Sequence, residues 1–346
     1  MKLKINRSYD LTKKPFVIAE IGHNHQGSVK IAKQLILSAK ESGASAVKFQ
    51  KRNNKKLYTK ELYDQIYDHP NSYAKTYGEH REALEFNFKE FKELSDYAKK
   101  IDIIFFATPF DIDSVDFLEK LKVPCYKIAS ADLVNIPLQN YIASKNKPIF
   151  LSTGGGTISD ILRAYNNIYK KNKKLAILHC TASYPAEIKD MNLRVIEVLK
   201  KKFPKIPIGL SDHENGIDAA PVAYMLGARI FEKHFTLNRA WKGTDQAFSL
   251  EPQGLKKLVR NLNRIETLLG SRTKSILPCE LNPIKKMAKS IVASKHLEKN
   301  HTVKIEDLAF KSPGGGLKPY LYKSLINKKT KKIIKIDEKI KLSDLK

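Results

Sequence analysis

The stretch PIGLSDHENGIDAAPVAYMLGARIFEKHFT, residues 207–236, contains a short apolar run, a helix-like segment and a second apolar run. Both runs, 207–213 and 228–236, end in polar side chains, as buried strands do when their carboxyl ends carry a functional site. Between them, residues 217–226 have helical spacing, and Gly227 follows where a helix C-cap favours glycine. Six earlier runs have the same character: FVIAEIG (16–22), AVKFQ (46–50), IIFFATP (103–109), CYKIAS (125–130), PIFLSTG (148–154) and LAILHCT (175–181).

This repeated alternation of strand and helix predicts the fold class. Helix-like segments at 28–42, 90–100, 113–121 and 158–170 separate the runs, and a helix at 251–268 follows the last one. Eight such units predict an α/β protein with a closed (β/α)8 TIM barrel. An open doubly wound sheet is the alternative, but no GxGxxG motif follows the first run.

The remaining residues predict a second, smaller domain. Residues 271–284 contain two prolines and no clear period, which is typical of a linker. Beyond them lie short β-like runs, SIVAS and IIKI, and a PGGG turn at 313–316. We therefore assign residues 1–282 to the barrel with its linker and 283–346 to a small C-terminal domain. A domain of that size is short for independent folding and is expected to pack on another surface.

The net charge is strongly positive, +27, from 63 basic and 36 acidic residues. Of the basic residues 53 are lysine, scattered in short clusters, and no nucleic-acid motif accompanies them. This scattered distribution of lysines favours a solvated lysine-rich surface over a specific nucleic-acid interface. Such a surface also helps to steer small anionic substrates.

Several absences predict a cytoplasmic protein. No apolar run approaches the roughly 18 residues of a membrane span. The first residues, MKLKINRSYDLTKK, contain no apolar segment of the kind that a signal peptide needs. The three cysteines lie far apart with no CxxC pair, which disfavours disulfides and a zinc knuckle and fits a reducing compartment.

Two histidines, His213 and His234, end the seventh and eighth strands, which are neighbours in a closed barrel. Imidazoles there can share one divalent metal and leave positions open for water and substrate. Hydrogen-bonded histidines, or histidines that bind a phosphate, are the alternative. Glu20 on the first strand and Asp245 after the eighth add acidic groups, which favours the metal.

Two lysines, Lys48 and Lys127, end the second and fourth strands. Their ammonium groups repel each other at a barrel mouth unless an anion lies between them. The hydroxyls of Ser130, Ser152 and Ser211 and the glycine-rich loop after Ser152 can donate to the same anion. These groups predict a ligand with a phosphate, a carboxylate or both. The alternative is a Schiff-base aldolase that uses one of the lysines.

For five other polar residues the sequence gives weaker predictions. His23 and His25 form either a polar substrate gate or a hydrogen-bonded turn. His179 is expected to be a buried, hydrogen-bonded histidine and not a ligand. Tyr184 either walls a sugar pocket or lies on a surface loop, and strand alternation points Asp212 away from the mouth.

Nine short motifs occur along the chain in this order: AEIGHNHQG, AVKFQ, ATPFD, YKIAS, LSTGG, HCTASYP, GLSDH, EKHFT and GTDQAFSLEP. This series resembles the N-acetylneuraminate (sialic acid) synthase family, and the resemblance runs from about residue 15 to 325. The tail, SIVASKHLEKNHTVKIEDLAFKSPGGGL, is similar to the antifreeze-like (SAF) domain that ends such synthases. The resemblance implies a TIM barrel in a domain-swapped homodimer, with the small domain of one chain capping its partner's site.

The resemblance also implies a reaction. The family condenses phosphoenolpyruvate with an open-chain N-acetylmannosamine-like aldose and water to give a nine-carbon nonulosonic acid, a precursor of surface glycans, and phosphate. A divalent metal, Mn²⁺, Mg²⁺ or Co²⁺, would bind to His213 and His234, and Glu20 matches the family's acid/base carboxylate. The implied substrate-binding residues are Lys48, Gln50, Lys127, Ser130, Ser152 and Ser211 for phosphoenolpyruvate, and Asp132, Tyr184 and Asp245 near the sugar.

Three positions depart from the family pattern. Ser312 stands where the small domain commonly offers an arginine to the N-acyl group, and serine cannot supply a bidentate fork. Asp132 replaces a longer glutamate, and Ala182 replaces a polar residue of some relatives. The aldose therefore stays open among N-acetylmannosamine, its 6-phosphate and 6-deoxy diamino sugars. A Schiff-base aldolase and a non-catalytic sugar-phosphate-binding barrel are the other functions considered.

Overall fold

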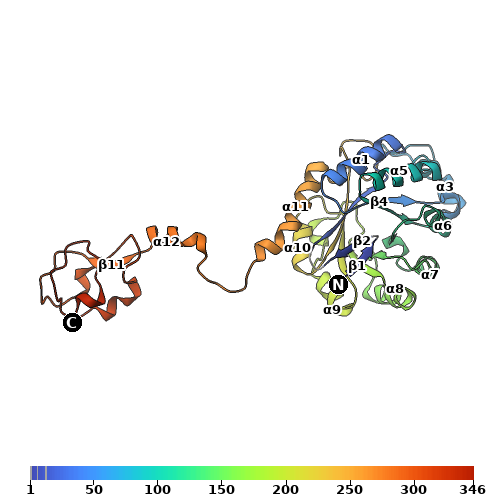
Figure 1. Cartoon of the computed structure of the whole chain (residues 1–346). Helices are drawn as coiled ribbons and strands as arrows, with labels where there is room; N and C mark the ends of the chain where they lie inside the picture. The colour runs from blue at the N-terminus through green and yellow to red at the C-terminus, as the bar shows by residue number, and fades with distance from the viewer. Residues whose placement is uncertain (1, 6, 12–13) are drawn as a thin grey trace. The chain divides into compact units, whose positions relative to one another are not determined.

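The computed structural model describes residues 2–5, 7–11 and 14–346. Eight parallel strands close into a barrel in the order β10-β3-β4-β5-β6-β7-β8-β9 (Figure 1). This confirms the predicted (β/α)8 barrel. The strands are β3 (Phe16–Gly22), β4 (Ala46–Lys51), β5 (Ile104–Pro109), β6 (Tyr126–Ile128), β7 (Ile149–Ser152), β8 (Leu175–Cys180), β9 (Ile208–Asp212) and β10 (Ile230–His234).

Strand alternation divides the barrel residues into two cores. Outward-facing residues such as Val17, Ala19 and Val47 pack with the helices in the main hydrophobic cluster. Inward-facing residues at the amino-terminal ends fill the lumen. There the rings of Phe16 and Phe106 each pack on Phe150, with centroids 6.0 Å and 5.6 Å apart. Towards the carboxyl ends the inward positions become polar, so the lumen changes from an apolar floor to a charged mouth.

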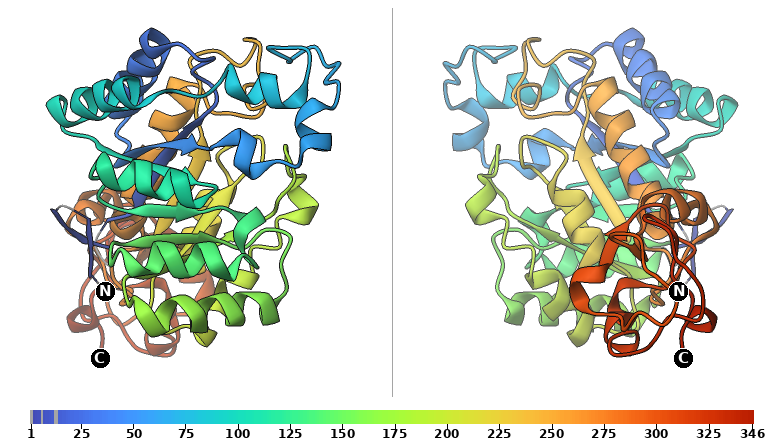
Figure 2. Two further views of the ribbon diagram at one scale, coloured as in Figure 1. Left: turned by 90° about the vertical axis from the view of Figure 1, so that its right-hand side faces the viewer. Right: turned by 90° about the vertical axis from the view of Figure 1, so that its left-hand side faces the viewer.

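Helices surround the strands, as Figure 2 shows. Several begin at a side chain that accepts a hydrogen bond from the first turn, including Ser28, Asn87, Asp111 and Thr157. The helices of this part of the chain are α1 (Val29–Glu41), α2 (Asn54–Leu57), α3 (Lys60–Asp64), α4 (Tyr77–Glu82), α5 (Phe88–Lys100), α6 (Ile112–Lys120), α7 (Ile136–Ser144), α8 (Ile158–Lys171), α9 (Val195–Lys202), α10 (Ala219–Met225) and α11 (Pro252–Leu269).

An antiparallel hairpin, which sequence patterning did not predict, precedes the barrel. Its strands are β1 (Lys2–Ile5) and β2 (Arg7–Asp10). Ile5 and Leu11 are buried in the same cluster as the apolar lumen residues, so this segment closes the floor of the barrel.

The chain divides after Leu269 into two compact units. In the second unit, β11 (Ser290–Ala293) pairs antiparallel with β12 (Leu308–Lys311), preceded by the exposed helix α12 (Leu281–Met287). A small core holds this unit together, formed by residues such as Ile291, Val303, Leu325, Ile334 and Ile340. The IIKI run at 333–336 makes only an isolated bridge with Leu297 and not a strand. No helix in the described part of the chain is long and apolar enough to cross a membrane.

Candidate active site at the barrel mouth

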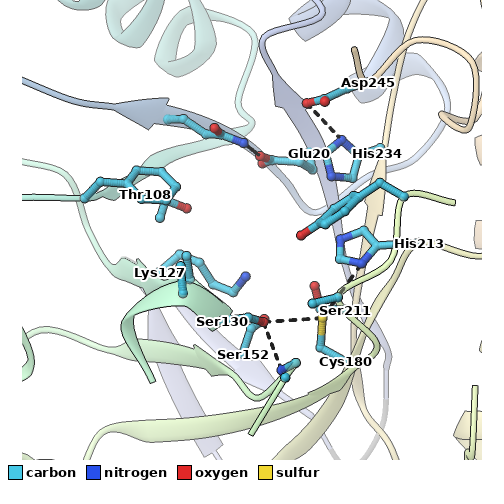
Figure 3. Close-up of a pocket in the computed structure, with 18 of the residues that line it drawn as sticks. Glu20, Thr108, Lys127, Ser130, Ser152, Cys180, Ser211, His213, His234 and Asp245 are labelled. Atoms are coloured by element: carbon cyan, nitrogen blue, oxygen red, sulfur yellow. Dashed lines mark hydrogen bonds and ion pairs between the residues drawn. The ribbon is translucent and has the colours of Figure 1, made fainter. Parts of the chain in front are cut away.

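A cavity of about 920 Å³ opens at the carboxyl ends of the barrel strands. Strand alternation points every second residue into it, and the registers of neighbouring strands place these residues side by side. Figure 3 shows the side chains facing one another around the cavity. The predicted site residues that line it are Glu20, Lys48, Gln50, Lys127, Ser130, Ser152, Tyr184, Ser211, His213, His234 and Asp245.

The two lysines are held together by a carboxylate of the protein itself. Glu232 Oε1 lies 2.8 Å from Lys127 Nζ and 3.7 Å from Lys48 Nζ, and it accepts a hydrogen bond from Ser211 Oγ at 3.2 Å. Burial alone would raise the pKa of Glu232, but the two ammonium groups lower it to about 2. The anion that the paired lysines require is therefore present before any ligand binds.

Glu20 forms a second acidic group beside Lys48. Its Oε2 lies 2.7 Å from Lys48 Nζ, and its Oε1 accepts a hydrogen bond from Gln50 Nε2 at 2.7 Å. Burial raises the pKa of Glu20 to about 7, although Lys48 opposes the shift. Near neutral pH this carboxyl is thus balanced between its protonated and ionised forms, as an acid/base group requires.

A glycine keeps this corner of the cavity open. Gly22 has a left-handed φ of +52°, and a Cβ at this position would lie 3.1 Å from Asp245 Oδ2 and 3.3 Å from both Gln50 Nε2 and Glu20 Oε1. Three polar groups from different parts of the chain therefore converge where a side chain is absent. Glu20 and Asp245 thus lie close to each other beside Gly22.

The two histidines lie next to each other, with ring centroids 5.4 Å apart. His213 Nδ1 is 2.9 Å from the carbonyl oxygen of Thr181, to which it donates when protonated, so its Nε2 is left for a ligand. His234 Nδ1 has no hydrogen-bond partner among the described residues and lies 3.7 Å from Asp245 Oδ2.

Burial keeps both imidazoles neutral. It lowers the pKa of His213 to about 4, with a further contribution from His234, and that of His234 to about 3, with a contribution from Lys48. Neutral imidazole is the form that binds a metal ion. In the described part of the chain, however, no three His, Cys, Asp or Glu side chains are already grouped as a metal site.

Two of the predicted serines, Ser130 and Ser152, lie near Lys127 in Figure 3. Ser130 Oγ accepts a hydrogen bond from the backbone N–H of Gly154 at 2.9 Å and lies 3.5 Å from Cys180 Sγ. Ser152 Oγ is buried and has no partner among the described residues. An unpartnered buried hydroxyl next to Lys127 suits an anionic ligand oxygen.

Two predicted substrate-binding residues have other surroundings. Tyr184 packs on His213, with ring centroids 4.2 Å apart, and is 56 % exposed at the rim. Asp132 is not among the residues that line the cavity; its Oδ1 instead accepts a hydrogen bond from Asn135 Nδ2 at 2.9 Å. A role for Asp132 in substrate binding stays a prediction.

Three less specific predictions are resolved by contacts. His179 Nε2 lies 2.7 Å from the carbonyl oxygen of Met191, as expected of a buried, hydrogen-bonded histidine. Asp212 pairs with Lys233 at 2.8 Å and does not line the cavity, so it points away from the mouth as predicted. Of the two histidines near residue 24, His23 lines the cavity, and His25 accepts a hydrogen bond from the N–H of Gly27 in a turn.

Sequence reasoning assigned no role to several residues at the site. The sequence marks Glu232 only as one of the polar residues near the ends of the eight predicted strands. Thr108, which accepts a hydrogen bond from Lys48 Nζ at 2.9 Å, is likewise a polar residue near the end of β5. Arg52 and Arg81 line the cavity from the segment between β4 and α5, where no strand or motif points to them.

The fold and the site define a class of protein. A barrel with buried lysines, carboxylates and histidines at the carboxyl ends of its strands is a TIM-barrel enzyme, because the lumen below is a packed core and the charged groups gather where such enzymes bind substrate. The sequence profile of the NeuB family matches residues 35–274. The chain belongs to this family.

Relatives of known name support that membership across nearly the whole chain. N-acetylneuraminate-9-phosphate synthase of Mus musculus is 40 % identical, covering 92 % of this chain and 88 % of the relative. N,N'-diacetyllegionaminic acid synthase of Campylobacter jejuni is 37 % identical, covering 95 % and 99 %. The crystal structure of a sialic acid synthetase from Leptospira borgpetersenii, in complex with citrate, superposes with a TM-score of 0.71 at 33 % identity, covering 82 % of this chain and 95 % of that one.

Proposed function

We propose that the protein condenses phosphoenolpyruvate with an N-acetylmannosamine-like aldose and water to give a nonulosonic acid and phosphate. The observation that carries this proposal is the row Glu20–Lys48–Glu232–Lys127 at the cavity, a proton carrier next to paired cations. Phosphoenolpyruvate carries roughly three negative charges, and two buried ammonium groups with serine hydroxyls beside them suit such a ligand.

The residues have separable tasks in this reaction. C3 of phosphoenolpyruvate attacks the aldehyde carbon, water adds at C2, and phosphate leaves with cleavage of the C–O bond. Glu20, with its pKa near 7, accepts or donates the protons that these steps move. Lys48, Lys127 and Ser152 bind the anionic groups, and Asp245 contacts sugar hydroxyls.

A divalent metal fits the residues present. His234 Nδ1 is a buried atom without a hydrogen-bond partner, and His213 is held through Nδ1 so that Nε2 is available. His213 and His234 would hold the ion, with Asp245 next to them. When bound, Mn²⁺, Mg²⁺ or Co²⁺ would polarise the aldehyde oxygen as a Lewis acid.

The small unit and the assembly complete the proposal. Residues 283–346 would be an antifreeze-like (SAF) domain that caps the site of a partner chain in a domain-swapped homodimer. The transferase would work in the cytoplasm, where phosphoenolpyruvate is available. Support for the capping role comes from the small core of the second unit and its many exposed apolar side chains, such as Tyr320 and Ile333.

One observation favours a second candidate. Burial lowers the pKa of Lys127, a property shared by lysines that form Schiff bases. A Schiff-base aldolase would use pyruvate, need no metal and be trapped by borohydride.

The decisive experiment is phosphate release from phosphoenolpyruvate. N-acetylmannosamine, its 6-phosphate and 6-deoxy diamino sugars are each supplied with and without Mn²⁺, and the His213→Ala variant serves as the control. Release that depends on an aldose and on Mn²⁺ supports the condensation. No release with any of these sugars, or a borohydride-trapped adduct with pyruvate, would overturn it.

A further inference from the structure

Two arginines that line the cavity contact the same imidazole. Arg52 lies two positions beyond Gln50, past the end of β4, and its Nη1 is 3.0 Å from Nε2 of His23. Arg81 comes from α4, and its Nη1 is 3.1 Å from Nδ1 of the same ring. All three residues line the same cavity as Glu20.

These contacts cannot all be hydrogen bonds. A guanidinium has only N–H donors and stays protonated in proteins, so both arginines can only donate. A neutral imidazole has one acceptor nitrogen; its other nitrogen carries a hydrogen and faces a second donor. Burial and the two arginines lower the pKa of His23 well below its ordinary value, which keeps the ring neutral. The cluster therefore contains one opposed pair of N–H groups.

Among the described residues, no carboxylate forms a direct ion pair with either guanidinium. Glu85 pairs with Lys51 at 2.6 Å and accepts only the backbone N–H of Arg52, and Asp245 lies beside His234. The Nε of Arg81 is buried and has no hydrogen-bond partner among the described residues. Arg52 is buried and Arg81 is half-buried. Desolvated guanidinium groups without a direct ion pair are costly, and a site for an anion is a physical reason for their convergence.

The other contacts of the arginines fix their orientation. Arg52 stacks on Phe110, with Cζ 3.8 Å from the ring centroid, and its Nη2 donates to Gln50 Oε1 at 2.6 Å. Arg81 Nη2 donates to the hydroxyl of Tyr77 at 3.0 Å. A chain of hydrogen bonds thus runs from Glu20 through Gln50 to Arg52 and links the site of reaction to the arginine pair.

We propose that Arg52, His23 and Arg81 bind a phosphate ester at the end of the aldose remote from its aldehyde, so that the preferred substrate is a sugar phosphate. This inference rests on the proposed condensation. Lys48 and Lys127 are assigned to phosphoenolpyruvate, whereas the arginine pair lines the same cavity from the segment between β4 and α5 and would meet the second substrate. A dianionic phosphate accepts hydrogen bonds from both guanidiniums and relieves the opposed N–H groups on His23.

The test compares N-acetylmannosamine with its 6-phosphate in wild-type protein and in Arg81→Gln. Calorimetric titration of each sugar gives its affinity, and phosphate release gives kcat/KM. In Arg81→Gln the affinity for the 6-phosphate should fall by about 10- to 150-fold, the worth of a charge-assisted hydrogen bond, while binding of the unphosphorylated sugar changes little. Arg81→Lys should restore part of the loss. Arg264→Gln, an exposed charge on α11, is the matched control and should change nothing.

Three outcomes would overturn the assignment. The first is equal binding of the two sugars by wild-type protein, the second is equal weakening of both by Arg81→Gln, and the third is a raised KM for phosphoenolpyruvate in that variant instead. Failure of every sugar to release phosphate would count against the condensation alone, because the titrations report on the anion site without turnover.

Discussion

Replacement of Glu20 by glutamine tests the central electrostatic argument. Glu20 is 1 % exposed, and its burial raises the pKa from an ordinary 4.5 to about 7. For a carboxyl whose folded pKa is raised, ionisation in the folded state is penalised. Below pH 4.5 the raised pKa costs no stability, because the carboxyl is protonated in both the folded and the unfolded state. The loss of folding free energy grows as the pH rises and is complete above about 7. Glutamine resembles the protonated carboxyl at every pH and carries no such penalty.

The size of the effect follows from the shift. The pKa of Glu20 is raised by about 2.5, and one pKa unit corresponds to about 1.36 kcal/mol, so the shift is worth about 3 kcal/mol. The free energy of unfolding of Glu20→Gln, minus that of wild type, should therefore increase by about 3 kcal/mol between pH 4.5 and 8. Any loss that does not depend on pH, such as the weaker contact with Lys48, shifts the whole curve and leaves this increase unchanged.

The assay is chemical denaturation of metal-free wild-type and variant protein at several pH values in this range. A parallel pH profile of kcat/KM should show a limb near pH 7 in wild type, and the variant should lose about 10²- to 10⁴-fold of the rate, the usual contribution of a general acid or base. A stability difference that is flat with pH would refute the reasoning. It would mean that Lys48 fully compensates for the burial of Glu20.

Three further predictions concern the anion site, the metal and the small domain. Lys48→Ala and Lys127→Ala should each raise the KM for phosphoenolpyruvate by about 10- to 150-fold, more than that for the aldose, whereas Lys257→Ala on the exposed side of α11 should not. Chelation should abolish turnover and Mn²⁺ should restore it; full activity in a demonstrably metal-free sample would exclude the role of the metal. Deletion of residues 283–346 should leave a folded barrel with a higher aldose KM and lower kcat. Mixing that truncated chain with full-length His213→Ala should recover activity in part, and subunit exchange without recovery would contradict capping in trans.

The barrel could be predicted because its signal is repeated. Each strand contributes an apolar run with a polar end, and a parallel barrel brings all eight ends to one face. The same rule correctly placed Glu20, Lys48, His213 and His234 together. This rule depends only on where each residue lies along its own strand.

Other features depend on contacts across the barrel and left no local pattern. The interaction of Glu232 with both lysines joins strands that are not neighbours, so sequence patterning gave no sign that a carboxylate of the protein lies between them. Arg81 reaches the cavity from a short helix in a long connection, and no periodicity marks such a position. The hairpin at the start of the chain escaped prediction for a related reason, since its strands are short and pair only with each other.

The hairpin that closes the barrel floor has a kinetic consequence. Ile5, Leu11 and the lumen phenylalanines fill the amino-terminal end of the barrel, below the cavity at the carboxyl ends of the strands. Under the proposed function, a ligand bound beside Lys127 and Ser152 would leave past the space that the second substrate occupies. For the proposed condensation we therefore expect phosphoenolpyruvate to bind before the aldose. Steady-state kinetics should then show ordered addition, in which excess aldose slows the escape of the first substrate.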